Sequence, residues 1–213
     1  MIPPFFYLLT MTPLQEYIEK NIIPLYDHFD KGHQRDHVQS VIKESIELAK
    51  EHGARLDMAY AIAAFHDIGL SVDRAKHHIH SGRILMKDPI LSQFFSREEL
   101  IIMRDAVEDH RASNTYPPRT LYGAIVAEAD RHIQPETILR RTLQFGLKEN
   151  PNASFDIHFE RAYQHMIEKY AEGGYMKLWL QSKRNVEGLN NLRKIIKDKE
   201  SMRKICERIF DNL

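Results

Sequence analysis

The chain has 213 residues, which is enough for one domain with a sizeable hydrophobic core. Thirty lysines and arginines balance thirty aspartates and glutamates, so the formal net charge is zero and provides no overall field for a nucleic-acid polymer or an acidic membrane. The single cysteine, Cys206, cannot form an internal disulfide, which is typical of a reducing compartment. We therefore expect a cytoplasmic protein.

An apolar stretch opens the chain at residues 2–9. It is too short to span a bilayer, and it lacks the basic lead and the small-residue cleavage site of a secretion signal. We expect it to pack on the body of the protein as a tail.

Apolar residues recur at helical spacing through the first part of the chain. The helix from about 57 to 65 is apolar on every side, so we expect it to be buried all round. A capping box from Ser96 to Glu99 opens a later helix, and the pair Ser81-Gly82 allows close approach to a neighbouring helix. The helices predicted in this part are 12–26, about 34–51, 57–65, 77–86, 96–111 and 121–130.

The remainder of the chain is also helical in pattern, with breaks at Asn150-Pro151 and Gly173-Gly174. It shows neither strand-like alternation nor an internal repeat, and we predict an all-α fold. We expect a single domain over 1–213, with a metal-site core at about 30–135 and C-terminal helices at about 136–213 packed on it. The helices predicted in this part are about 136–147, 155–172, 175–196 and 199–211.

A histidine and an aspartate, His66 and Asp67, end the apolar helix and are followed by Gly69, which is suited to stopping a helix. Burying this pair without partners would cost on the order of several kcal/mol. A divalent metal satisfies both groups at once, because it takes neutral imidazole and ionised carboxylate as ligands. A second helix of small residues delivers another carboxylate, Asp130, near its end.

Histidine is unusually frequent, with twelve in the chain, and it is the commonest metal ligand. A catalytic metal site needs three or four such groups and an open position for water. Six candidates therefore indicate two ions that share a bridging carboxylate, with Asp67 as the natural bridge and the central catalytic residue. His78 or His80 could take the place of His77. The candidate ligands are His37, His66, Asp67, His77, His110 and Asp130.

The order of these residues resembles the HD superfamily of metal-dependent phosphohydrolases. The resemblance rests on His37, on His66-Asp67 after an apolar Ala-Phe, and on Ala129-Asp130 in a helix, and it spans about residues 30–135. It implies a helical bundle with a divalent-metal centre that hydrolyses a phosphate ester or anhydride.

Two further histidines are similar to those of bimetallic members of the superfamily, such as HD-GYP phosphodiesterases and HD-type dinucleoside tetraphosphate hydrolases. His77 precedes the small pair Ser81-Gly82, and His110 precedes a loop that leads to the final aspartate. No Gly-Tyr-Pro follows His110, so hydrolysis of cyclic di-GMP is not implied. The segment from Glu108 to Ser113 also resembles an uncharacterised set of bacterial HD proteins.

The ligands are imidazoles and carboxylates without a thiolate, which favours one or two divalent ions of Mn, Fe, Zn, Ni or Mg. Such an ion lowers the pKa of a bound water towards neutrality, and the hydroxide attacks phosphorus. His33, one turn before His37, is a candidate proton donor to the leaving oxygen, and Asp109 or Glu108 is a candidate to orient a ligand histidine or to handle a proton. The candidate phosphate-binding cations are Arg74, Lys76, Arg111 and Arg131.

We therefore predict a metal-dependent phosphohydrolase that cleaves a phosphate ester or anhydride of a nucleotide or a similar small phosphorylated molecule. Two alternatives stay open: a diiron oxygenase on the same ligand set, and a sensor that binds a nucleotide at a metal site without turnover. The expected partner is a small molecule rather than a nucleic-acid polymer or a membrane, and a homodimer is possible.

Overall fold

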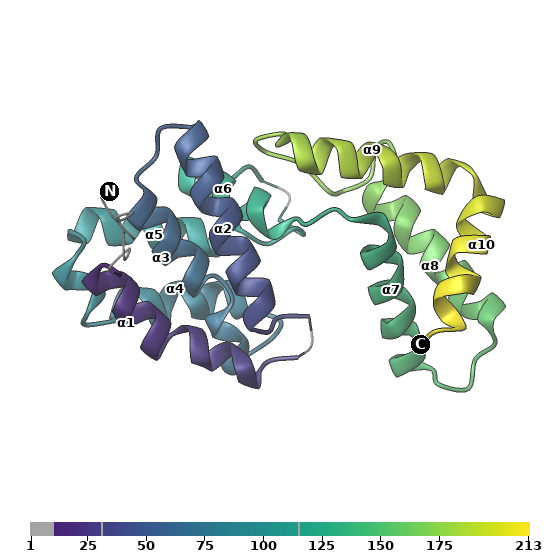
Figure 1. Cartoon of the computed structure of the whole chain (residues 1–213), viewed down its shortest axis with the longest axis horizontal. Coiled ribbons are helices and arrows are strands. Elements are labelled where there is room, and N and C mark those ends of the chain that lie inside the picture. Colours follow the sequence, from purple (N-terminus) through teal and green to yellow (C-terminus); the bar gives the residue numbers. More distant parts are fainter. Residues whose placement is uncertain (1–10, 31, 115) are drawn as a thin grey trace, which may run out of the picture. The chain divides into compact units, whose positions relative to one another are not determined.

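The computed structural model describes residues 11–30, 32–114 and 116–213. Within these ranges the chain forms ten α-helices and three short 3₁₀ helices, without a strand, so the predicted all-α fold is confirmed (Figure 1). None of the described helices is both long enough and apolar enough to cross a membrane. The expectation for residues 2–9 falls outside the described ranges.

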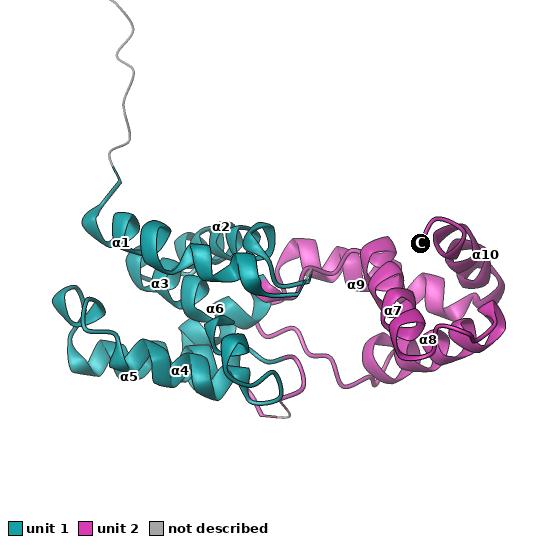
Figure 2. Ribbon diagram, turned by 90° about the horizontal axis from the view of Figure 1, so that it is seen from below, with its two compact units in different colours: residues 1–111, 118–129 teal, residues 112–117, 130–213 magenta. Residues whose placement is uncertain are grey.

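The chain divides into two compact units (Figure 2). Unit 1 consists of residues 1–111 and 118–129, and unit 2 consists of residues 112–117 and 130–213. Most of the predicted metal-site core belongs to unit 1, and the predicted C-terminal helices belong to unit 2. That the chain is a single domain with those helices packed on the core stays a prediction.

Unit 1 is built around α3, whose residues from Met58 to Phe65 are all buried, as its sequence predicts. Helices α2 and α5 both pack on it, and α4 packs on α5. The elements of this unit are α1 (Pro13–Asn21), η1 (Ile23–His28), α2 (Arg35–Glu51), α3 (Leu56–Phe65), η2 (Ile68–Ser71), α4 (His77–Lys87), η3 (Leu91–Gln93), α5 (Arg97–Asp109) and α6 (Leu121–Asp130), the last residue of which belongs to unit 2.

The first predicted helix, 12–26, is wrong after Asn21. An α-helix forms only to Asn21, and the 3₁₀ helix η1 takes over from Ile23. Pro24 explains the change, because it has no N–H to donate and its ring clashes with the carbonyl four residues earlier in an α-helix. The tighter turn brings Tyr26 into the core, where its side chain is fully buried.

Small residues let α4 lie close against its neighbours in unit 1. A Cβ added at Gly69 would lie 2.2 Å from the carbonyl oxygen of His77 and 2.5 Å from the backbone nitrogen of Ser81. The Ser81 hydroxyl instead accepts a hydrogen bond from the Gly69 N–H at 2.8 Å. On the facing side, Gly82 lies against the Glu108 side chain of α5, so the predicted close approach of Ser81-Gly82 is confirmed.

Unit 2 is a bundle of four helices with a hydrophobic core of its own, in which Cys206 is fully buried. The helix predicted at 175–196 is wrong at its start, because the chain becomes helical only at Lys183. Ser182 caps that helix by accepting a hydrogen bond from the Asn185 N–H, and Gln181 before it has a φ of 53° that an α-helix cannot contain. The helices are α7 (Pro135–Glu149), α8 (Phe155–Tyr170), α9 (Lys183–Lys197) and α10 (Lys199–Phe210).

Candidate metal centre

The His66-Asp67 pair lies at the buried C-terminal end of α3, with His66 fully buried and Asp67 only 3% exposed. Tyr26 holds this turn from η1. Its hydroxyl donates a hydrogen bond to the Ala64 carbonyl at 2.9 Å and accepts one from the Asp67 N–H at 3.3 Å. The backbone that carries both side chains is therefore fixed from two sides.

The two carboxylate oxygens of Asp67 face two different pairs of histidines. Oδ2 lies 3.1 Å from Nε2 of His66 and 3.5 Å from Nε2 of His37. Oδ1 lies 3.3 Å from Nε2 of His77 and 3.4 Å from Nε2 of His110. Each set of three ligand atoms forms a compact group that could hold a metal ion, and Asp67 belongs to both groups.

The spacing within each group suits a metal ion. The Nε2 atoms of His37 and His66 are 3.3 Å apart, and so are those of His77 and His110. Ligand atoms bound about 2.1 Å from one ion lie about 3.0 Å apart in octahedral geometry and about 3.4 Å apart in tetrahedral geometry. The separations of 3.1–3.5 Å in both groups match these values.

Backbone carbonyls set the tautomer of three of these histidines. In each ring, Nδ1 lies within hydrogen-bond distance of the carbonyl three residues earlier: 2.7 Å for His66, 2.9 Å for His77 and 2.6 Å for His110. A carbonyl can only accept, so Nδ1 carries a proton, and in the neutral ring that binds a metal the lone pair is on Nε2. In the second group the two Nε2 atoms stand 3.3 Å apart, so with both rings neutral their lone pairs would repel unless a proton or a cation lay between them.

The electrostatics of the site also favour a cation. His66 is the C-cap of α3 and His110 is the C-cap of α5, so the negative ends of two helix dipoles meet at the ligands. Burial opposes ionisation of Asp67, but the charge of His66 and hydrogen bonds with His110 and His37 hold its pKa well below the usual range. Burial, followed by the charge of His110, lowers the pKa of His77, which favours the neutral ring that binds metals.

Of the three clustered histidines, His77 is the one that the structure places in the second group. His78 belongs to neither group, and its Nδ1 is buried without a hydrogen-bond partner. Burial and the charge of His110 lower the pKa of His78 to about 4. His80 lies one turn after Lys76 in α4 and belongs to neither group.

Two of the three predicted cations of unit 1 line a pocket beside the second group. A pocket of about 390 Å³ is lined by Arg74, Arg111 and the ligand His77, together with His33. Arg111 donates a hydrogen bond to the Ala75 carbonyl at 2.9 Å. Lys76 is exposed at the N-cap of α4 and does not line this pocket.

Asp30 is a functional candidate that sequence reasoning missed. Its carboxylate accepts hydrogen bonds from Nδ1 of His33, at 2.9 and 3.0 Å, and pairs with the guanidinium of Arg74. Asp30 therefore fixes two residues of the pocket at once. The available signal was its position three residues before His33 in a turn, where an aspartate commonly bonds its neighbours.

Asp109 and Glu108 are both bonded by Arg119, which sequence reasoning also missed. The backbone N–H of Arg119 donates to Asp109 at 2.7 Å, its Nε donates to the same carboxylate at 3.1 Å, and its Nη2 donates to Glu108 at 2.9 Å. These bonds tie the α5–α6 loop to the end of α5, next to His110. The predicted proton-handling role of Asp109 stays a prediction.

The last two predicted site residues fall at the start of unit 2. Asp130 ends α6, and Arg131, which is 7% exposed, follows it. Both influence the pKa of the Lys169 ammonium. Burial is the main cause that lowers this pKa, the charge of Asp130 raises it, and the charge of Arg131 lowers it further. Metal ligation by Asp130 and phosphate binding by Arg131 stay predictions.

A scan against protein-family models, a search of curated proteins and a search of solved structures each found no match for this chain. The resemblance to HD phosphohydrolases therefore stays a prediction, whereas the two His/Asp groups are features of the structure itself.

Proposed function

We propose that unit 1 is a metal-dependent phosphohydrolase of the HD type, with two divalent ions bridged by Asp67. One observation carries the proposal: each oxygen of this single buried carboxylate faces its own pair of histidine Nε2 atoms. Paired ions about 3.5–4 Å apart are typical of enzymes that hydrolyse phosphate esters.

The number of protein ligands supports catalysis rather than a structural role. Each group supplies three protein atoms, which leaves positions for water and substrate, whereas structural sites are closed by four. Imidazole and carboxylate donors without a thiolate favour Mn, Fe, Zn or Ni. When bound, such ions would activate water near neutral pH and neutralise phosphoryl oxygens.

The surrounding residues supply the remaining functions. Arg111 carries the positive charge that a phosphoryl group needs beside His77, and the guanidinium of Arg74, which is paired with Asp30, adds hydrogen-bond donors in the same pocket. Nδ1–H of His33 donates to Asp30, so it is the doubly protonated His33 ring that would give its Nε2 proton to the leaving oxygen. These roles, with a small phosphorylated molecule as the substrate, are part of the proposal.

The proposal is tested by elemental analysis of the purified protein together with phosphate release from a panel of phosphate esters and anhydrides. We expect two bound metal ions in the wild type, and loss of both metal and activity in Asp67→Ala. His52→Ala is the matched control, because this exposed histidine caps α2 and belongs to neither group. It should keep both metal and activity.

Two results would overturn the proposal. The first is a wild type that stays inactive on the whole panel after Mn, Fe, Ni or Zn is restored. The second is consumption of oxygen by the iron-loaded protein without phosphate release, which would instead support a diiron oxygenase on the same ligands.

A further inference from the structure

We propose that unit 1 binds a phosphate monoester whose leaving group is an uncharged nucleoside, with the nucleobase against Phe29. The inference rests on the proposed phosphohydrolase function and adds the substrate class. It follows from a second pocket in the same unit that adjoins the pocket beside His77.

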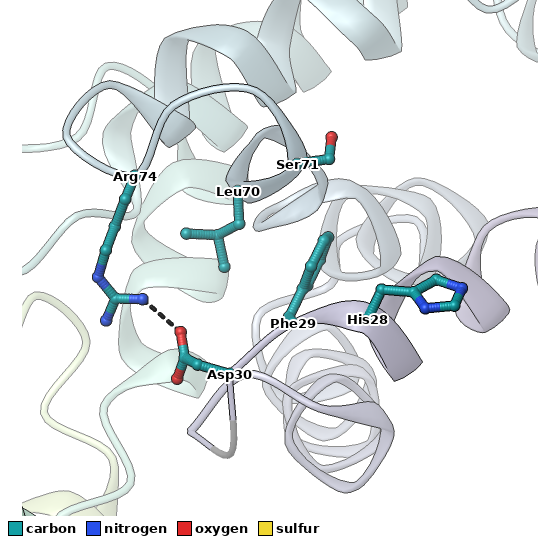
Figure 3. Close-up of a pocket in the computed structure, with 6 residues that line it drawn as sticks. All are labelled: His28, Phe29, Asp30, Leu70, Ser71 and Arg74. Atoms are coloured by element: carbon teal, nitrogen blue, oxygen red, sulfur yellow. Dashed lines mark hydrogen bonds and ion pairs between the residues drawn. The ribbon is translucent and has the colours of Figure 1, made fainter.

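The two pockets share a wall formed by Leu70 and Arg74. The first, which we call the phosphoryl lobe, has a volume of about 390 Å³ and contains His77 and Arg111. The second, which we call the leaving-group lobe, has a volume of about 500 Å³, and Figure 3 shows its lining. A substrate that lies across Arg74 can thus place its phosphate at the metal ligands and the rest of the molecule in the second lobe.

The leaving-group lobe offers an aromatic ring beside polar groups. Phe29 is half-buried, and its ring makes an edge contact with buried Tyr26 at 5.1 Å between centroids, which holds it in place. Leu70 adds apolar surface, and the Asp30 carboxylate and the Arg74 guanidinium add hydrogen-bonding groups. A pocket of this size with an aromatic face and a few polar groups suits a ring-bearing small molecule.

The charges that line the leaving-group lobe favour a phosphate monoester over a phosphate anhydride as the substrate. In the leaving-group lobe the guanidinium of Arg74 is paired with the carboxylate of Asp30, as the dashed line in Figure 3 shows, so the two charges cancel. An anhydride would leave a charged phosphate in this lobe, next to a carboxylate. A monoester leaves a neutral nucleoside, whose hydroxyl or amino groups can donate to Asp30. The lobe therefore favours nucleoside monophosphates.

The test compares phosphate release by the metal-loaded full chain from three substrates. Adenosine 5′-monophosphate carries the base, ribose 5-phosphate lacks it, and adenosine 5′-diphosphate has a charged leaving group. We expect kcat/KM to be about tenfold higher for the monophosphate than for ribose 5-phosphate, because stacking of a base on an aromatic ring contributes that much. The diphosphate should be the poorer of the two nucleotide substrates.

Phe29→Leu keeps an apolar side chain but removes the aromatic face. It should lower kcat/KM for the nucleoside monophosphate about tenfold while leaving ribose 5-phosphate within about twofold and the metal content unchanged. Phe94→Leu is the matched control, because Phe94 is also half-buried in unit 1 but lines neither pocket. It should leave the ratio between the two substrates unchanged.

The inference and the proposed function fail in different ways. Equal turnover of ribose 5-phosphate and the nucleoside monophosphate, an unchanged ratio in Phe29→Leu, or a preference for the diphosphate would overturn the inference and leave a metal-dependent phosphohydrolase. A protein that releases phosphate from none of the three, after metal loading, and from no other ester would overturn the proposed function, and the inference would fall with it.

Discussion

At the scale of single residues, the site depends on groups that hold the ligands as much as on the ligands themselves. Tyr26 bonds both sides of the His66-Asp67 turn, and backbone carbonyls orient three of the four histidine rings. Tyr26 and Asp30 are two such supporting residues. Substituting either one should change stability or metal affinity without removing a candidate ligand.

Tyr26→Phe removes the hydroxyl but keeps the ring in the core. Because the buried Asp67 N–H and Ala64 carbonyl lose their partner, we expect the free energy of unfolding to fall by about 2 kcal/mol. Metal affinity should fall about tenfold, as is typical when a group that supports a ligand is removed. Calorimetric titration with the metal and urea denaturation measure the two effects.

Tyr60→Phe is the control for this variant. Its hydroxyl is part-buried in the same unit but bonds Glu19, away from the ligand groups. It should lower stability without changing metal affinity. Equal losses of metal affinity in both variants would show that Tyr26 acts only through general stability.

Asp30 gives a prediction on pH. Burial opposes its ionisation, but bonds from His33 and Arg74 lower its pKa from 3.8 to about 2. Because the folded pKa is the lower one, the stabilisation is fully present above the unfolded value and is lost as pH falls from about 4 to about 2. Asp30→Asn should therefore be less stable than the wild type near neutral pH, and the difference should vanish near pH 2. Denaturation across this range measures it; a difference that is independent of pH would contradict the prediction.

At the scale of elements, the second ligand group depends on how closely the turn after α3 approaches α4. Gly69→Ala would force a Cβ against the His77 carbonyl and the Ser81 nitrogen, both of which are backbone atoms that cannot move independently. We expect a loss of about 1–3 kcal/mol and displacement of His77 from its group. Elemental analysis should then show metal content falling towards one ion per chain.

Gly82→Ala provides the comparison. The atoms nearest to a Cβ there belong to the side chains of Glu108 and Arg104, at 3.0 and 3.1 Å, and these side chains can shift. The loss of stability should be smaller and the metal content unchanged. Full metal content in Gly69→Ala would show that the position of His77 does not depend on this contact.

At the scale of the whole molecule, the chain consists of two compact units with separate cores, and Cys206 reports on unit 2 alone. Burial, followed by the charge of Glu207, raises the pKa of this thiol to about 11. A thiol-specific aromatic disulfide reagent at a pH of about 8 should therefore react with the native protein very slowly and with the unfolded protein at once. Fast reaction of the native protein would contradict a packed core around α10.

The local pattern of apolar residues was sufficient to predict most of the helices and the burial of α3. Helical periodicity is a property of residues close in sequence, so apolar spacing is enough to locate a helix. The all-apolar run before His66 likewise predicts that the end of α3, with its pair of candidate ligands, is buried. The failures are local conflicts that spacing does not detect: Pro24 converts the end of the first helix to 3₁₀ geometry, and Gln181 has left-handed backbone just before the ninth helix begins.

The sequence alone thus determined the all-α class, the buried His66-Asp67 pair and the imidazole and carboxylate chemistry of the candidate ligands. Only the tertiary structure decided which oxygen of Asp67 faces which histidines, and that His77 rather than its neighbours completes the second group. It also placed backbone carbonyls beside Nδ1 of three of these histidines and paired Asp30 with Arg74. The physical reason is that each of these contacts depends on how helix ends and turns pack together in three dimensions, which spacing along one chain does not specify.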